Sequence, residues 1–290
     1  TLLKVYVKAL RSGAKHPELQ AVAVVAASKL LLGRVVSDRD VAAELLKTLV
    51  VAYFEPASAG NQSVRQALNY FLPVFCYSRA ENQDLMRRVA LDALHTLYNV
   101  REGFDDDDAD IDDEMVSLAT IGACLVDWTD PRKVYTPDAG GLQAEKHVNA
   151  DVHLDFAKAI LERLEGNVPR TSSPFSPSPP SPLITLPLLP YPGEEKKVLA
   201  SLLSKLYISP ASSPDKTRET YRVVSAAVDT NLLPDTTSRN ALYKIHVSLG
   251  KIVNALDGAV PSVETASVAG STGTGIGTPT PTAATGRRVT

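Results

Sequence analysis

A proline lies inside an apolar helical pattern in QSVRQALNYFLPVFCYS, residues 62–78. Two sets of apolar positions recur there at helical spacing. The first is Val64, Ala67, Leu68, Phe71 and Phe75, and the second is Tyr70, Val74 and Tyr77. An interior proline such as Pro73 removes a helical hydrogen bond and bends the helix. A bent helix with two apolar sides is expected to pack on two sides, as helices do in stacked arrays of hairpins.

Helical periodicity extends over most of the 290-residue chain, and no alternating strand pattern is present. In residues 81–99, for example, the apolar positions Leu85, Val89, Ala93, Leu94 and Leu97 share one helical side. Helices are predicted over residues 1–11, 17–33, 38–54, 61–78, 81–99, 114–127, 150–166, 194–208, 215–230 and 236–257. The first five have similar lengths and short connecting turns. This pattern predicts an all-α fold, a HEAT-type or armadillo-type α-solenoid.

Three segments interrupt the predicted array. Residues 101–114, REGFDDDDADIDDE, form an acidic loop. Residues 169–192 are rich in proline and serine, and residues 258–290 have the composition of a flexible tail, so we expect both to be disordered. The predicted organisation is therefore a helical array over 1–168, this Pro/Ser-rich linker, C-terminal helices over 193–257 that pack on the array, and the tail.

The net charge of −3 conceals an uneven distribution. Residues 1–101 contain 13 Lys/Arg against 8 Asp/Glu, whereas residues 102–168 contain 5 against 17. On the first helix Lys4, Lys8 and Arg11 share one side, and Lys15 follows closely. With Arg87 and Arg88 they are candidate contacts to DNA phosphates. The alternative is an ordinary solvated surface.

Catalytic and metal-binding patterns are not evident in the sequence. The GTGIG of the tail lacks the strand and helix that a phosphate-binding loop requires. His147 and His153 are more typical of a solvated helix start than of a metal site. Cys76 and Cys124 lie in apolar helical stretches, which predicts buried free thiols in a reducing compartment. We therefore expect no enzymatic activity, no metal and no cofactor.

No apolar run has the length of a membrane span, and no signal peptide opens the chain, so we expect no membrane partner. The helical pattern begins at Thr1, as in a mature chain or a piece of a longer protein.

Several Ser-Pro pairs are candidate phosphorylation sites. Four of them lie in the Pro/Ser-rich linker, at Ser173, Ser176, Ser178 and Ser181. A fifth, Ser213, is followed by Pro214, Asp215 and Lys216, the fuller pattern that cyclin-dependent kinases favour. Ser213 is equally well suited to be the N-cap of the next helix. Phosphates would add negative charge close to a surface that is expected to bind DNA.

The stretch LVVAYFEPASAGNQSVRQALNYFLPVFCYSRAENQDLM resembles the C-terminal conserved region of the CAP-G-type HEAT-repeat subunit of condensin. The resemblance rests on an aromatic residue before a Glu-Pro turn, a polar pair, an aromatic run around a proline, and a Ser-x-x-Asn-Gln turn. In this chain these are Tyr53 to Pro56, Asn61–Gln62 with Arg65 and Leu68, Tyr70 to Phe75, and Ser78 to Gln83. The close match covers roughly residues 40–100.

The resemblance implies a non-catalytic subunit that binds the condensin kleisin and, with it, duplex DNA without sequence preference. The SMC subunits would supply the ATPase, and the protein would act on mitotic chromosomes and in the nucleus, with a cytoplasmic pool. Helices 38–54 and 81–99 would line the concave side. The Tyr70, Val74 and Tyr77 set would then be a kleisin-docking candidate, unless it packs between repeats. The alternative function is a HEAT-repeat adaptor or scaffold with no nucleic-acid role.

Overall fold

The computed structural model describes residues 2–13, 15–102, 115–136, 148–166 and 193–258. Within these ranges the chain forms ten α-helices and two 3-10 helices, with no β-strand. The α-helices are α1 (Leu2–Leu10), α2 (Pro17–Leu32), α3 (Arg39–Phe54), α4 (Gln62–Ser78), α5 (Ala80–Glu102), α7 (Leu118–Trp128), α8 (Val152–Leu164), α9 (Gly193–Leu203), α10 (Pro214–Asp229) and α11 (Thr236–Gly258). The 3-10 helices are η1 (Pro56–Ser58) and η3 (Pro131–Lys133).

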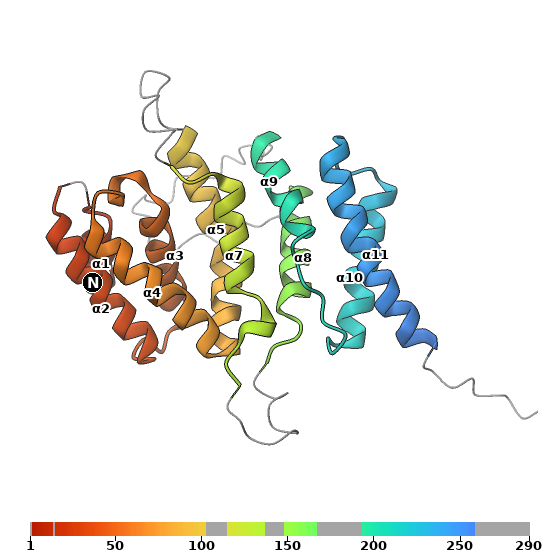
Figure 1. The fold of residues 1–290 in the computed structure, drawn as a ribbon, viewed down its shortest axis with the longest axis horizontal. Helices are drawn as coiled ribbons and strands as arrows, with labels where there is room; N and C mark the ends of the chain where they lie inside the picture. Colours follow the sequence, from red (N-terminus) through yellow and green to blue (C-terminus); the bar gives the residue numbers. More distant parts are fainter. Residues whose placement is uncertain (1, 14, 103–114, 137–147, 167–192, 259–290) are drawn as a thin grey trace, which may run out of the picture.

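The helices form two layers, and within the molecule they succeed one another in order from α1 to α11 (Figure 1). One layer contains α1, α3, α5, α8 and α10, each packed on the next. The other contains α2, α4, α7, α9 and α11, packed in the same way. Consecutive helices such as α1 and α2, α4 and α5, or α10 and α11 pair across the layers as hairpins. The predicted α-solenoid of HEAT type is confirmed by this arrangement.

The helix ends follow local capping chemistry. Asp38 caps α3 by accepting from the main-chain N–H groups of Asp40 and Val41. Asn61 caps α4 through the N–H of Val64, at 3.3 Å. Pro17 and Pro214 stand in the first turns of α2 and α10, where a missing N–H leaves no bond unmade.

Three predicted helix ends were wrong by about one turn. Helix α5 continues to Glu102, with Arg101 in its last turn, a position that the helix dipole favours for a cation. Helix α7 begins at Leu118 because Ser117 caps it by accepting from the N–H of Thr120. Helix α9 ends at Leu203 rather than at residue 208. The N–H of Lys205 turns back to the carbonyl of Leu202, and Ile208 is buried beyond the helix.

The first apolar set on α4 faces the core as predicted. Val64, Leu68, Phe71 and Phe75 are buried, and Ala67 is partly buried. The second set does not pack as expected, because Tyr70 is 72% exposed and Val74 is 38% exposed. Only Tyr77 is packed against the core. The expectation that α4 is covered on two sides was therefore wrong for most of its second side.

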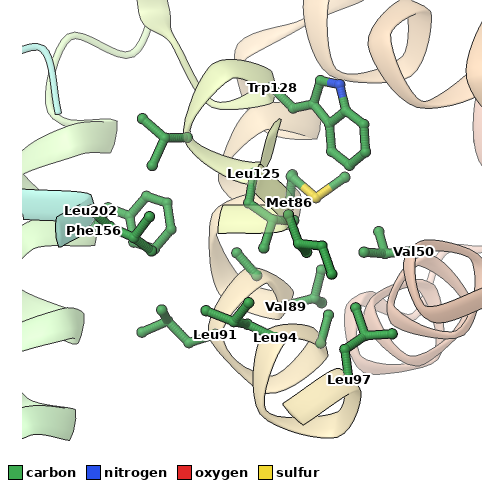
Figure 2. Close-up of a cluster of buried hydrophobic side chains, with 14 of the residues drawn as sticks. Val50, Met86, Val89, Leu91, Leu94, Leu97, Leu125, Trp128, Phe156 and Leu202 are labelled. Carbon is green, nitrogen blue, oxygen red and sulfur yellow. The ribbon is translucent and has the colours of Figure 1, made fainter. Parts of the chain in front are cut away.

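The core runs between the layers as one continuous cluster. The predicted apolar face of α5 is entirely buried, including Val89 and Leu94. Figure 2 shows α5 side chains meeting Val50 of α3 on one side and Leu125 of α7 on another. Because α5 packs on α3, α4, α7 and α8, it ties the first half of the array to the second. That α3 and α5 line a concave side stays a prediction.

Several expectations fall on residues outside the described ranges. These are the acidic loop after Glu102, the Pro/Ser-rich linker, all but the first residue of the tail, His147, and the linker serines Ser173, Ser176, Ser178 and Ser181. The domain boundaries stay predictions.

Candidate partner and nucleic-acid interface

The solvent-facing side of α4 carries an aromatic and an aliphatic side chain one helical turn apart, Tyr70 and Val74. Pro73 lies inside the helix between them. Since proline has no N–H, the main-chain carbonyl of Asn69 cannot receive its helical hydrogen bond from position 73. The Asn69 side chain is engaged separately, because its Oδ1 accepts from the Tyr53 hydroxyl at 3.0 Å. This side of α4 therefore presents apolar groups, and the main chain of the helix carries one carbonyl that lacks its helical donor.

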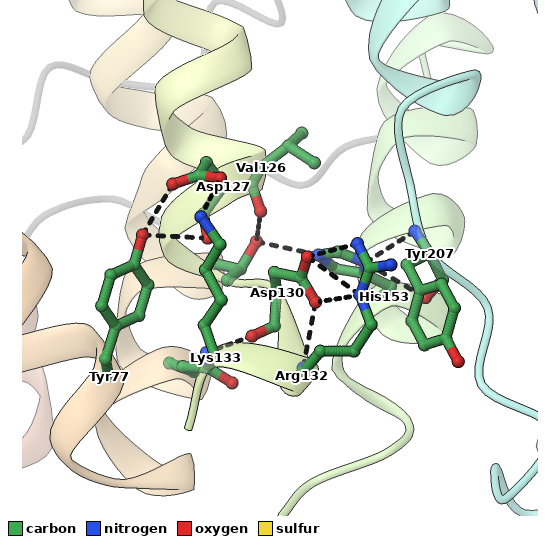
Figure 3. A network of polar contacts seen from close by, with 10 residues as sticks. Tyr77, Val126, Asp127, Asp130, Arg132, Lys133, His153 and Tyr207 are labelled. Atoms are coloured by element: carbon green, nitrogen blue, oxygen red, sulfur yellow. Dashed lines mark hydrogen bonds and ion pairs between the residues drawn. The ribbon is translucent and has the colours of Figure 1, made fainter. Parts of the chain in front are cut away.

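Tyr77, the third member of the predicted set, has a different environment. Its hydroxyl donates to Oδ2 of Asp127 over 2.6 Å, and Lys133 Nζ donates to the other oxygen of that carboxylate (Figure 3). Burial, with the hydrogen bond to Asp127 and its charge, raises the pKa of Tyr77. Burial alone would raise the pKa of Asp127, but the bonds from Lys133 and Tyr77 lower it overall. Tyr77 thus joins α4 to α7 and the segment after it.

Tyr135 is bonded through its main chain to the end of α4. Its main-chain N–H donates to the carbonyl of Tyr77 over 2.7 Å, while its side chain is 68% exposed. Sequence reasoning missed Tyr135, because its position beside α4 depends on the path of the chain after α7. The only sequence signal is an aromatic residue in a polar stretch.

A second polar cluster lies beside η3. The Asp130 carboxylate accepts three hydrogen bonds from the Arg132 guanidinium, whose carbon lies 4.1 Å from the centre of the Tyr207 ring. Burial opposes ionisation of Asp130, but the bonds from Arg132 lower its pKa overall. The Nε2 group of Gln83 on α5 donates a hydrogen bond to the main-chain carbonyl of Asp130 over 2.7 Å. The cluster fixes the segment after α7 between α5 and the loop that follows α9.

His153 was predicted to stand at a solvated helix start, and that prediction was wrong. Its side chain is buried, with Nε2 3.2 Å from the Thr129 hydroxyl and Nδ1 accepting from the N–H of Tyr207 at 2.9 Å. Burial lowers the pKa of His153, while the nearby Asp130 acts in the opposite direction. The imidazole therefore bridges α8, the end of α7 and the loop after α9.

The basic candidates lie in the layer that contains α1, α3 and α5, but the two groups are separated by α3. Three of the six are already paired with carboxylates. Arg11 pairs with Glu44 of α3 at 3.5 Å, and Arg88 with Asp40 of α3 at 3.2 Å. Arg87 forms two hydrogen bonds to Asp84 and keeps only 17% of its side chain exposed. Arg11 and Arg88 thus pair with the neighbouring helix α3, whereas Arg87 pairs within α5.

The three lysine candidates are arranged differently. Lys4 and Lys8 lie one turn apart on α1, Lys15 lies in the turn after it, and all three are exposed. Among the described residues, none of the three makes an ion pair. The structure therefore leaves these lysines, rather than the arginines, available to an external anion.

Ser213 immediately precedes α10, as predicted, but its side chain makes no capping hydrogen bond within the described structure. Its main-chain N–H donates to Asp151 at 2.7 Å, and the neighbouring Ser212 hydroxyl donates to the carbonyl of Ala150 at 2.8 Å. Lys216 pairs with both Asp151 and Asp155. The motif is thus held against the start of α8.

Cys76 is buried and Cys124 is half-buried, and both are free thiols. Burial raises the pKa of each. In the part of the chain that the structure describes, no group of three or more His, Cys, Asp or Glu side chains is placed to hold a metal ion. None of the described helices is both long and apolar enough to cross a membrane.

Comparison with known proteins identifies relatives of this chain. A family model described as "Nuclear condensing complex subunits, C-term domain" matches residues 1–208. Condensin complex subunit 3 of Schizosaccharomyces pombe is 31% identical over 226 residues, which cover 76% of this chain and 22% of the relative. The protein of the same name from Saccharomyces cerevisiae is 33% identical over 136 residues, or 46% of this chain and 13% of that protein.

A solved structure is also similar to the whole array. A chain in the crystal structure of the S. pombe condensin Cnd3-Cnd2 subcomplex aligns with 87% of this chain and 28% of its own length. The TM-score is 0.63 and the sequence identity is 27%. The present chain therefore spans less than a third of the length of these relatives.

Proposed function

Since this chain belongs to the family of condensin complex subunit 3, matching the model of its C-terminal domain over residues 1–208, we propose that it is a non-catalytic HEAT-repeat part of condensin. It binds the kleisin subunit and, together with it, duplex DNA without sequence preference. The observation that carries the proposal is the similarity, over 87% of the chain, to a subunit crystallised within the Cnd3-Cnd2 subcomplex.

The shape of the array supports a role in binding an extended partner. Each described hairpin contacts mainly its neighbours, so the two layers offer long surfaces to a partner. In this proposal the SMC subunits, reached through the kleisin, supply the ATPase of the complex. The chain then acts in mitotic chromosome condensation, in the nucleus and on chromosomes, with a cytoplasmic pool.

The proposed DNA contacts are the exposed lysines of the first hairpin, Lys4, Lys8 and Lys15. Lysine side chains bind phosphates without reading bases, which suits sequence-independent binding. Arg11, Arg87 and Arg88 would contribute only after giving up carboxylate partners. They are therefore weaker candidates than the sequence pattern indicated.

Phosphorylation of the linker serines Ser173, Ser176, Ser178 and Ser181 is proposed to regulate DNA binding by adding negative charge to the complex. Ser213 is a less accessible target, because its main-chain N–H and the hydroxyl of Ser212 are bonded to the segment at the start of α8. A kinase would need to detach the first turn of α10 from α8 before it reached Ser213.

The pairing of the arginines also favours a second function, a HEAT-repeat adaptor or scaffold with no nucleic-acid role. In that case the first hairpin carries ordinary solvated lysines. The two functions differ in one measurable respect, since only the first predicts a salt-dependent affinity for DNA.

Co-expression of the chain with the kleisin subunit of the same organism tests the proposal. We expect the two to co-elute from a size-exclusion column and to bind duplex DNA with an affinity that falls steeply as salt rises. The matched variants are Lys4→Glu/Lys8→Glu on α1 and Lys244→Glu/Lys251→Glu on α11, all at exposed positions. Only the first pair should weaken DNA binding. Failure to co-elute would contradict the proposed function, and co-elution without DNA binding would support the adaptor.

A further inference from the structure

Large exposed apolar side chains occur at three places along the described array. At the first hairpin and the loop after it they are Val5, Leu19, Val22, Val25, Leu32 and Val35. On the last helix they are Tyr243 and Val247, and between these ends they are Tyr70, Val74, Val116 and Tyr135. A solenoid exposes apolar groups at an open end because no further hairpin covers them there. That explanation does not apply to Tyr70 and Val74.

Helix α4 already has both of its neighbours within its layer. It packs on α2 on one side and on α7 on the other, and its core-facing side is buried. Packing between repeats is thus complete around α4, yet Tyr70 keeps 72% of its surface exposed. Among the described residues, no element covers the exposed apolar groups of α4, so these groups are left for a molecule outside this array.

We define the α4 outer surface as Tyr70, Pro73 and Val74, with Tyr135 at the end of the helix. Residues 70 and 77 are about 10 Å apart along the helix axis. Tyr135 is anchored beside position 77 by its N–H bond to the Tyr77 carbonyl. The surface therefore begins at Tyr70, and the main chain holds the exposed Tyr135 at the end of α4. Tyrosines are among the residues that contribute most to protein–protein binding, because a rigid ring buries a large area.

The main chain of α4 indicates the conformation of the occupant. Pro73 leaves the carbonyl of Asn69, the residue before Tyr70 in the sequence, without its helical donor. An extended polypeptide presents main-chain N–H groups that are free to donate, whereas a helix has already used its own. An extended segment with apolar side chains therefore suits both features of the surface.

We propose that the α4 outer surface docks an extended apolar segment of the kleisin. This inference rests on the proposed function, and the similar chain of known structure was crystallised with a second condensin subunit. Tyr70 and Val74 contact the segment, and the Asn69 carbonyl accepts one of its N–H groups. Tyr77 is a positioning residue, because its hydroxyl is held by Asp127 and its carbonyl by Tyr135.

The test compares two matched double variants of the chain by titration calorimetry against the kleisin. Tyr70→Glu/Val74→Glu places charge on the α4 outer surface, and Tyr243→Glu/Val247→Glu places the same charge on α11, also at exposed positions four residues apart. Both variants should retain the helical circular dichroism and melting temperature of the wild type, since none of the four side chains is buried.

We expect the α4 variant to bind the kleisin at least tenfold more weakly than the wild type, and the α11 variant to bind normally. Equal affinities for the wild type and both variants would overturn the α4 surface while leaving the proposed function intact. Equal weakening by both variants would also overturn it, because a general charge effect would then explain the loss. No binding by the wild type would overturn the proposed function and this inference together.

Discussion

The hydroxyl of Tyr77 donates a hydrogen bond to Oδ2 of Asp127 over 2.6 Å. Tyr70, the other aromatic residue on this side of α4, has a different environment. Tyr77 connects two neighbouring helices of one layer, whereas Tyr70 faces solvent. The second apolar set of α4 thus contains one residue that packs against a neighbouring helix, Tyr77, and one that is exposed, Tyr70. This difference has consequences for stability and for binding that are separately measurable.

Replacing Tyr77 with phenylalanine removes the hydroxyl and leaves the ring in place. We expect a loss of about 1 kcal/mol in the free energy of unfolding, because the half-buried Asp127 loses a donor. Thermal denaturation checks this, with Tyr70→Phe as the matched control that should change nothing. A Tyr77→Phe chain as stable as the wild type would show that Lys133 alone satisfies Asp127.

The pH dependence of stability should contain a contribution from His153. Burial lowers its pKa in the folded state, so the unfolded chain binds the proton more readily. The neutral histidine contributes fully above the unfolded pKa of about 6.5, and its contribution is lost as the pH falls from there toward the folded pKa.

Urea denaturation between pH 8 and pH 5 measures this effect. The wild type should lose stability on acidification, and His153→Gln should lose less over the same range, since glutamine does not titrate. The other histidines are present in both chains and cancel in the comparison. Parallel profiles for the two chains would exclude His153 as the source.

The first hairpin is tied to η1 and α4 through Gln20. Its Nε2 donates to the carbonyl of Leu10 at 3.0 Å and to the Ser58 hydroxyl at 2.8 Å, and its Oε1 faces Asn61. Gln20→Ala should destabilise the chain by about 1–3 kcal/mol, because buried polar groups lose their partners. Gln66→Ala, at an exposed position on α4, is the control for denaturant titration. Similar midpoints for both variants would contradict the structural role of Gln20.

The two thiols should differ in reactivity. Cys76 is completely buried with a raised pKa, so a thiol reagent should modify it only when the chain unfolds. Cys124 is half-buried and should react slowly in the folded chain. Counting modified thiols before and after denaturation, with Cys124→Ser as a control, checks this. Rapid modification of Cys76 in the folded Cys124→Ser chain would contradict the packing of α4.

The sequence predicted those features that depend on local periodicity. The buried faces of α4 and α5 follow from apolar residues at helical spacing, as at Leu68 and Leu94. Periodicity alone does not distinguish an apolar side that packs on a neighbour from one that faces solvent, so Tyr70 was expected to be as well covered as Phe71. The burial of His153 depends on the loop after α9, which lies 54 residues away in the sequence.

The candidate site shows the same limit. A basic stripe was visible in the spacing of Lys4, Lys8 and Arg11, but the pairing of Arg11 with Glu44 depends on how α1 packs on α3. Likewise Tyr135 reaches α4 only because the segment after η3 bonds to Tyr77. Partners brought together by tertiary packing have no signature in a single sequence.

Site-specific photocrosslinking can show directly whether α4 docks the kleisin. A photoreactive phenylalanine analogue is placed at position 70 or, as the control, at position 243, both of which are exposed tyrosines. Each chain is irradiated in complex with the kleisin, and crosslinked peptides are identified by mass spectrometry. We expect crosslinks from position 70 to one apolar kleisin segment and few from position 243. Crosslinks from position 243 with none from position 70 would contradict docking on α4.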